Sequence, residues 1–188
     1  MLTDEQKREF NHTGWLVLRD VFDNYEVEML SEAALEVLER TGPEVGREAD
    51  GSPHVCWGMH LFDERLKALT HHPVIVESSR EILENDIYVH QSRINMKQTN
   101  GSIVAWHQDF GTYHRVDGVP DPRGIMIAVF LDDVTDVNAP LLAVPGSHYE
   151  GLVSTANLDP TSVYFEQVSI YCYALTHDTL YRLVCAKC

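Results

Sequence analysis

The spacing of apolar residues along this chain changes near residue 87, and this change constrains the fold more than any other feature of the sequence. Across residues 26–40, and again in a stretch that begins at Pro73, apolar residues recur at helical spacing. From Ile87 onward the period is two, which is typical of strands. Helices followed by strands predict a mainly β fold, a barrel-like jelly roll with N-terminal helices packed on one side.

Capping and turn residues predict the first elements. Thr3, with Gln6 three residues later, has the form of a capping box, so a short helix is expected to begin there and to end at Gly14. Residues 15–18 (WLVL) then predict a short buried strand. Residues 44–60 lack periodicity and carry Gly, Ser and Pro, so we expect a loop there.

The charge balance excludes several classes of partner. Twenty-nine Asp and Glu residues against 14 Lys and Arg residues leave a formal net charge of −15, so a nucleic acid or an anionic membrane surface would be repelled. No apolar run approaches the roughly 20 residues that span a bilayer, and the N-terminal MLTDEQKREF is charged where a signal peptide is apolar. The four cysteines do not form the pattern of a disulfide framework. We therefore expect a cytoplasmic protein.

A polar face is predicted along residues 87–97. Alternation places the side chains of Gln91, Arg93, Asn95 and Lys97 on one face of an extended segment. Such a face is either a solvent-facing strand surface or the wall of a polar cavity, and alternation alone does not separate the two.

Residues 106–110 (WHQDF) contain a pair of metal-ligand types. If this segment is an extended strand, His107 and Asp109 project from the same face about 6 to 7 Å apart, so both can reach one ion. An HxD triplet is a weak signal by itself, because it is common by chance. Two His and one carboxylate form the set that binds iron(II) for oxygen chemistry, so a third ligand must come from elsewhere in the chain.

Four motifs in order resemble the phytanoyl-CoA dioxygenase family, and within it the ectoine hydroxylase branch. They are QSRINMK (91–97), WHQDF (106–110), DGVP (117–120) and NAPLLAVPGSH (138–148). The resemblance runs from the region of Thr3 to about Pro160 and implies a double-stranded β-helix, a cupin-like jelly roll. By position, it implies that His107 and Asp109 bind Fe(II), that Lys97 contacts 2-oxoglutarate and that Gln91 contacts substrate.

The resemblance also implies an activity. Fe(II), 2-oxoglutarate and O2 would together hydroxylate an aliphatic C–H bond, with succinate and CO2 as co-products. Related halogenases resemble this motif with a small residue in place of Asp109, so hydroxylation is favoured here. Ectoine hydroxylases have Trp where this chain has Tyr113 and Ser where it has Ala128. We therefore expect Tyr113 to contact a different substrate, a small polar and amino-acid-like metabolite; a homodimer is also allowed.

The chain departs from the family beyond the PGSH turn. Family members place a distal iron-binding His and an Arg for 2-oxoglutarate several tens of residues further on, whereas this chain has 40 residues after His148. We expect one domain with a mostly helical part (1–86), jelly-roll strands (87–160) and a divergent tail (161–188) that arose by frameshift, alternative splicing or an early stop. Missing closing strands would leave unpaired sheet edges. His177 and Arg182 are the late residues of the right types.

Two alternatives to an active hydroxylase stay open. The chain can be a catalytically impaired, truncated member of the family that acts as a remnant or binding protein. It can also be a cupin-like metal protein that uses no 2-oxoglutarate, with His148 completing the site. For His148 itself, a structural role in the turn is the favoured interpretation.

Overall fold

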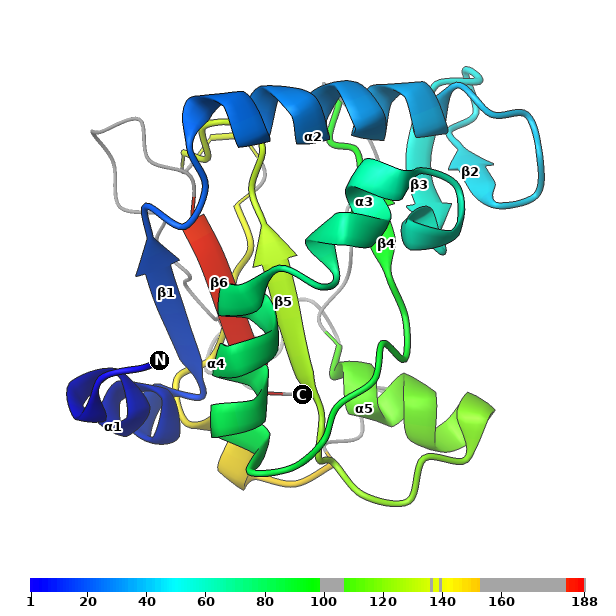
Figure 1. The fold of residues 1–188 in the computed structure, drawn as a ribbon. Helices are drawn as coiled ribbons and strands as arrows, with labels where there is room; N and C mark the ends of the chain where they lie inside the picture. Colours follow the sequence, from blue (N-terminus) through cyan, green and yellow to red (C-terminus); the bar gives the residue numbers. More distant parts are fainter. Residues whose placement is uncertain (99–106, 136, 139, 153–181, 188) are drawn as a thin grey trace. The chain divides into compact units, whose positions relative to one another are not determined.

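The structure, a computed structural model, describes residues 1–98, 107–135, 137–138, 140–152 and 182–187, the last range by its backbone alone. The chain divides into two compact units, one formed by Met1 and residues 20–104, the other by residues 2–19 and 105–188. Figure 1 labels the helices α1 to α5 and the strands β1 to β6. The described elements of the first unit are α2 (Asn24–Leu38), β2 (Val45–Arg47), β3 (Pro53–Trp57), the 3-10 helix η1 (Met59–Leu61), α3 (Glu64–Leu69), α4 (Pro73–Leu83) and β4 (Arg93–Asn95). Those of the second unit are α1 (Asp4–Thr13), β1 (Trp15–Arg19), α5 (Asp109–Thr112), the π-helix η2 (Tyr113–Asp117), β5 (Ile125–Val129), the 3-10 helix η3 (Ser147–Tyr149) and β6 (Arg182–Lys187).

The first helix of the second unit begins and ends as predicted. The Gln6 backbone N–H donates to Thr3 Oγ1 (3.1 Å) and the Thr3 N–H donates to Gln6 Oε1 (2.8 Å), which completes the capping box. Gly14 ends α1 in the left-handed conformation (φ 87°) and donates to the Phe10 carbonyl. The predicted strand at 15–18 is also confirmed, as β1.

The long helix α2 supplies most of the buried apolar side chains of the first unit. It begins two residues before the predicted stretch, because Asp23 accepts from the Glu26 N–H (2.8 Å) and forms a second capping box. Arg47 binds the C-terminal end of α2, because its Nη2 donates to the carbonyl of Leu38, the last helical residue, and to that of Arg40 just beyond it. The buried face of α2 consists of Val27, Leu30, Ala33, Ala34, Val37 and Leu38.

The loop predicted for residues 44–60 is wrong, because this segment contains the hairpin of β2 and β3. Val45 pairs with Cys56 and Gly46 with Val55, and the register shifts between Gly46 and Arg47. In the turn, Asp50 accepts from both the backbone N–H and the hydroxyl of Ser52. The Gly, Ser and Pro residues that suggested a loop therefore belong to a bulge, a turn and a strand end. β4 pairs with β3 and gives the order β2-β3-β4.

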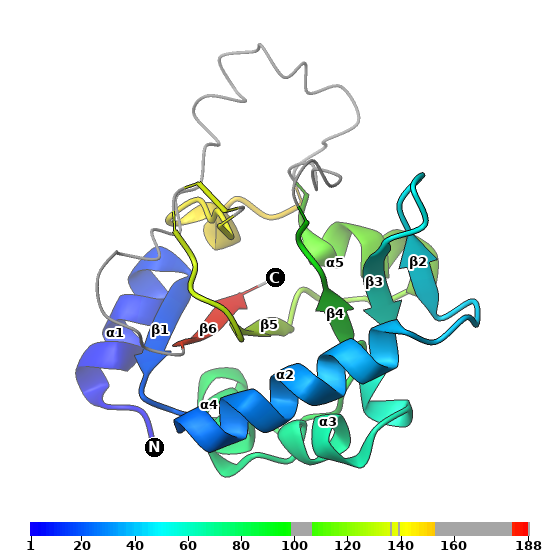
Figure 2. The same cartoon turned by 90° about the horizontal axis from the view of Figure 1, so that it is seen from above.

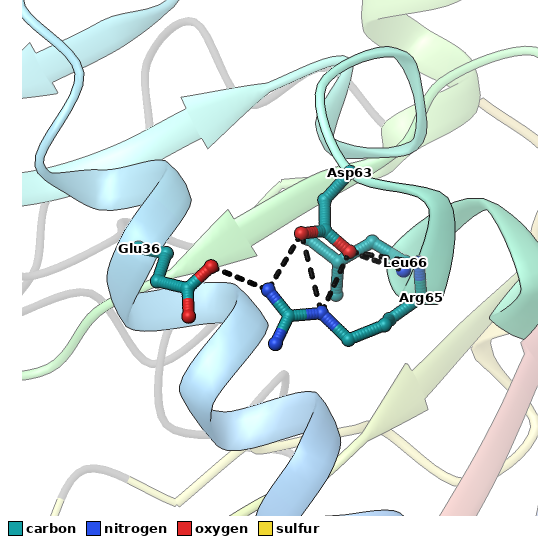
Figure 3. A network of polar contacts seen from close by, with 4 residues as sticks. All are labelled: Glu36, Asp63, Arg65 and Leu66. Carbon is teal, nitrogen blue, oxygen red and sulfur yellow. Dashed lines mark hydrogen bonds and ion pairs between the residues drawn. The ribbon is translucent and has the colours of Figure 1, made fainter.

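An arginine joins two helices of the first unit (Figure 3). Asp63 caps α3 by accepting from the Arg65 and Leu66 N–H groups, and the Arg65 guanidinium returns to Asp63 Oδ2 (2.7 Å). The same guanidinium reaches Glu36 Oε2 on α2 at 2.5 Å. The Arg65 hydrogen bond is the main reason that the pKa of Asp63 lies below its ordinary value. Leu66 beside it is 1% exposed.

The next helix, α4, begins at Pro73 as predicted. Its most buried side chains are Ser78 and Ser79, whose hydroxyls donate to the carbonyls of Val74 and Ile75 within the same helix. Among the residues that the structure describes, no helix has the length and apolar character needed to cross a membrane.

The sheet of the second unit has the order β1-β6-β5. β6 is antiparallel to both neighbours, and Val184 pairs with Val17 on one side and Ala128 on the other. Figure 2 shows β6 in red between β1 in blue and β5 in yellow-green. The tail that was predicted to diverge therefore provides the central strand of this sheet.

Candidate metal centre

His107 and Asp109 bring their side chains together in the second unit. His107 Nε2 lies 3.1 Å from Asp109 Oδ1, with the imidazole 40% exposed and the carboxylate 15% exposed. Trp106, the first residue of the motif, lies outside the described residues.

The strand predicted for this segment is wrong, although the convergence of the two side chains does not depend on it. Gln108 is extended (φ −109°, ψ 124°) and Asp109 is the first residue of α5. The Gln108 carbonyl accepts from Gly111 N (3.0 Å), and its side-chain Nε2 donates to the Gly151 carbonyl (2.8 Å). Both the backbone and the side chain of Gln108 are therefore hydrogen-bonded, and Gln108 lies between the two residues whose side chains meet.

The separation of the two ligand atoms fits a divalent ion. Two cis ligands of an octahedral ion, each about 2.1 Å from it, lie roughly 3.0 Å apart. Imidazole nitrogen and carboxylate oxygen are also the donor types of the two-His-one-carboxylate iron site. The same distance fits a hydrogen bond from a protonated Nε2 to the carboxylate. The pair is therefore compatible with a metal without requiring one.

A third ligand does not join this pair among the residues that the structure describes, since none of them forms a group of three His, Cys, Asp or Glu side chains suited to a metal. His177 lies outside the described range. Arg182 is the first residue of β6, where its backbone pairs with Arg19.

His148 is engaged with the end of α1. Its Nε2 lies 3.0 Å from the Asn11 carbonyl, which also accepts from the Tyr149 hydroxyl. Gly146 N donates to the Thr13 carbonyl (2.8 Å), so a second residue of the PGSH turn is bound to this helix. His148 Nδ1 is buried without a hydrogen bond in the described structure. This arrangement supports the structural role for His148 and gives no support to a cupin-like site completed by it.

Gln91 and Lys97, expected to contact substrate and 2-oxoglutarate, lie in the first unit, whereas Tyr113, also expected to contact substrate, lies in the second. Gln91 and Lys97 flank β4, which is much shorter than the strand predicted for 87–97. Pairing with β3 nevertheless continues at both ends, because Gly58 N donates to Ser92 O (2.7 Å) and Met96 N to His54 O (2.9 Å). Gln91, Asn95 and Lys97 are exposed, and Ser92, Ile94 and Met96 are half-buried, as alternation predicts. Arg93 departs from this pattern, because it is half-buried as well.

Tyr113 is half-buried at the junction of α5 and η2. Sequence periodicity missed both helical elements. A signal was available in the residues 118–120, because Gly118 ends η2 in the left-handed conformation (φ 70°) and donates to the Tyr113 carbonyl. The His114 ring lies tilted against that of Phe110 (centroids 5.3 Å apart), and its Nδ1 interacts with the Val119 carbonyl at 2.8 Å.

The curated proteins that this chain resembles in sequence include two that are each 36% identical to it. L-proline trans-4-hydroxylase from Streptomyces griseoviridis is 36% identical over 151 residues, which are 79% of this chain and 56% of that protein. An ectoine dioxygenase from Bordetella bronchiseptica is 36% identical over 154 residues, which are 78% of this chain and 50% of that protein. The chain thus spans about half the length of the curated relatives it matches.

Solved structures and a family match agree with these relatives. EctD from S. alaskensis with 2-oxoglutarate and 5-hydroxyectoine superposes with a TM-score of 0.84 at 24% identity, over all of this chain and 68% of that one. The same protein with bound Fe gives a TM-score of 0.82. This likeness confirms the predicted jelly-roll fold class. Residues 10–172 match the phytanoyl-CoA dioxygenase (PhyH) family. The match passes residue 160, where the resemblance was expected to end, and the chain therefore belongs to the phytanoyl-CoA dioxygenase family.

Proposed function

We propose that this chain is an Fe(II)- and 2-oxoglutarate-dependent dioxygenase that hydroxylates an aliphatic C–H bond of a small polar metabolite. The observation that carries the proposal is the 3.1 Å approach of His107 Nε2 to Asp109 Oδ1 in a member of this family. Its sequence relatives include a proline hydroxylase and ectoine dioxygenases, which supports this kind of reaction.

The roles of the chain's own residues follow from their chemistry. Neutral imidazole of His107 and ionised carboxylate of Asp109 would hold Fe(II) on one side. Bound Fe(II) with 2-oxoglutarate supplies the activation of O2 that an unactivated C–H bond requires. The Lys97 ammonium is a compact cation suited to a carboxylate of 2-oxoglutarate. The protein's remaining tasks are to position substrate and to exclude water.

The substrate class rests on Gln91 and Tyr113. Each offers a hydrogen-bonding group, and Tyr113 adds an aromatic surface, so a small molecule with both polar and aliphatic parts is suited to them. The relatives act on L-proline and on ectoine by their names. A cytoplasmic location and a homodimer stay predictions.

Anaerobic absorption spectroscopy tests the proposal. Addition of Fe(II) and 2-oxoglutarate to the chain should give a weak visible charge-transfer band, and His107→Ala should remove it because one imidazole ligand is lost. His12→Ala, an exposed His on α1, is the matched control and should keep the band. No band at saturating ligand for the unaltered chain would contradict the proposal.

A catalytically impaired binding protein of the same family is the second candidate. It is favoured by one observation, namely that no third His, Cys, Asp or Glu joins His107 and Asp109 within the described parts of the chain. Conversion of 2-oxoglutarate to succinate separates the two candidates. Succinate formation clearly above that of His107→Ala supports the dioxygenase, and equal background rates support the binding protein.

A further inference from the structure

A short segment of the second unit, residues 146–152, binds the end of α1 at its start. Gly146 N donates to the Thr13 carbonyl (2.8 Å), and His148 Nε2 lies 3.0 Å from the Asn11 carbonyl. Backbone hydrogen bonds of 3.0 and 3.1 Å then close the 3-10 turn η3, so the segment is compact from its first residues. The first half of the segment is therefore fixed to α1.

The end of the same segment binds α5 and the residue before it. Gln108 Nε2 donates to the Gly151 carbonyl (2.8 Å), although the two residues are 43 positions apart in the sequence. A Cβ added to the buried Gly111 of α5 would lie 3.0 Å from Leu152 Cδ1, so this leucine packs closely against the helix. One polar and one apolar contact thus join residues 151 and 152 to the turn that carries the candidate metal ligands.

Gln108 is well placed to control the separation of those ligands. Its backbone joins His107 to Asp109, and each residue has only two soft backbone dihedrals, so rotation at Gln108 moves one ligand relative to the other. The hydrogen bond to Gly151 restrains that rotation while His107 Nε2 and Asp109 Oδ1 lie 3.1 Å apart. A site that already has its binding geometry has the higher apparent affinity, because affinity falls with the fraction of competent molecules.

We infer that the 146–152 segment positions the metal-ligand pair, with Gln108 as the positioning residue and the end of α1 as the support of the segment. This inference rests on the proposed function. Gln108 itself contacts no ion; it acts through His107 and Asp109. The affinity for the metal therefore depends on contacts made far along the chain from the HxD triplet, including those with the N-terminal helix.

Titration of the full chain with Mn(II), followed by the electron paramagnetic resonance signal of the free ion, tests the inference. Mn(II) accepts imidazole and carboxylate ligands as Fe(II) does. Gln108→Met keeps the length of the side chain and removes its N–H donor, so Mn(II) should bind roughly three- to tenfold more weakly, as expected for one hydrogen bond. The spectrum of bound Mn(II) at saturation should be unchanged, because both ligands remain. His107→Ala should bind Mn(II) more weakly than either.

Asn138→Leu is the control for a merely structural role. Asn138 Nδ2 also donates to a backbone carbonyl of the second unit, that of Asp133 (2.6 Å). Its loss should lower the Tm and leave the Mn(II) affinity within about twofold, because this hydrogen bond does not involve the metal-ligand pair. Equal weakening of Mn(II) binding by Asn138→Leu and Gln108→Met would mean general loosening of the unit and would overturn the inference.

Gly151→Ala tests the acceptor side of the same contact and keeps the inference testable if Gln108→Met folds poorly. Gly151 is left-handed (φ 69°) with open space around it, so alanine strains the backbone without overlap. Mn(II) should bind about two- to fivefold more weakly, with little further loss when Gly151→Ala is added to Gln108→Met. Gly51→Ala, also left-handed (φ 88°) and open but in the hairpin of the first unit, should leave the affinity unchanged.

The outcomes separate this inference from the proposed function. Unchanged Mn(II) affinity in Gln108→Met, or full additivity of Gln108→Met and Gly151→Ala, overturns the inference alone. An unaltered chain that binds Mn(II) no more tightly than His107→Ala contradicts both, because the pair would then not bind a metal.

Discussion

The two sheets of this protein are assembled from very different stretches of chain. In β2-β3-β4 all three strands lie between residues 45 and 95, and β2 and β3 form a hairpin. In β1-β6-β5 the strands begin at residues 15, 182 and 125, and the last strand along the chain is the central one. Closing long loops costs more entropy before any contact forms. The first sheet can therefore form locally, whereas the second depends on β6.

The largest effect should come from Val184→Pro in β6. Proline removes a ladder hydrogen bond and is confined to edge strands in native sheets, so its cost at this central position should be roughly 4 kcal/mol of unfolding free energy. Hydrogen exchange should increase at the amides of β1 and β5 and stay slow in β3.

Val184→Ala, which keeps the backbone N–H, is the control and should retain most of the protection in β1 and β5. Equal loss of protection in β3 and in β5 after Val184→Pro would mean that the two sheets unfold as one cooperative unit.

The next largest effects should come from truncating one buried leucine side chain in each unit. Leu16 on β1 and Leu66 on α3 are each 1% exposed, and each Leu→Ala change should cost about 3 kcal/mol in chemical denaturation. If the units are independent, the double variant should lose the sum of the two values to within about 0.5 kcal/mol. A clearly smaller or larger loss would show energetic coupling between them.

Gly14→Ala should have a smaller effect that probes a non-local contact of the second unit. Gly14 is left-handed, and an added Cβ would overlap the His148 imidazole. We expect a loss of about 2 kcal/mol, part of it from backbone strain.

Gly118→Ala is the matched control, because Gly118 is also left-handed (φ 70°) and has open space around it. It should cost about 1 kcal/mol in thermal unfolding, from strain alone. Adding His148→Ala to Gly14→Ala should recover stability only if the overlap with His148 matters, and no recovery would contradict this contact.

The smallest effect should follow from Asp63→Asn in the first unit. Asparagine keeps the helix cap but removes the charge that faces Arg65. The pKa of Asp63 is depressed in the folded state, so its carboxylate contributes to the free energy of unfolding above the unfolded pKa of about 3.9. This contribution is lost as pH falls through the pKa of the folded state. Asp63→Asn should lower the Tm by roughly 2 °C or less at pH 7, and the difference should close below about pH 4.

The exposed pair of Arg123 and Asp121 in the second unit provides the comparison for this variant. Its side chains are 76% and 57% exposed, so Asp121→Asn should leave the Tm unchanged at every pH. A larger effect of Asp121→Asn than of Asp63→Asn would mean that partial burial does not strengthen the first pair.

Local signals allowed part of this fold to be predicted from sequence. The cap at Thr3, the end at Gly14 and the start of α4 at Pro73 each depend on interactions within a few residues, and all three were predicted. The β2-β3 hairpin was missed because Gly and Pro serve bulges and strand ends as well as loops. β6 was missed because its partners lie more than 50 residues away, where periodicity carries no information.

The candidate site was likewise predicted only in part. The approach of His107 to Asp109 was predicted from their spacing, although through a strand and not through the turn that α5 provides. Alternation also placed Arg93 on the same face as Gln91, whereas the structure leaves Gln91 exposed and Arg93 half-buried.

The central place of β6 has a consequence for biosynthesis. β1 and β5 leave the ribosome well before β6, and at about 5–20 residues per second the roughly 50 residues between β5 and β6 take on the order of 3 to 10 s to be made. During that interval both strands carry open edges on the nascent chain. Chaperone binding to those edges, or pairing between neighbouring nascent chains on one messenger, would decide how much folded protein each round of translation yields.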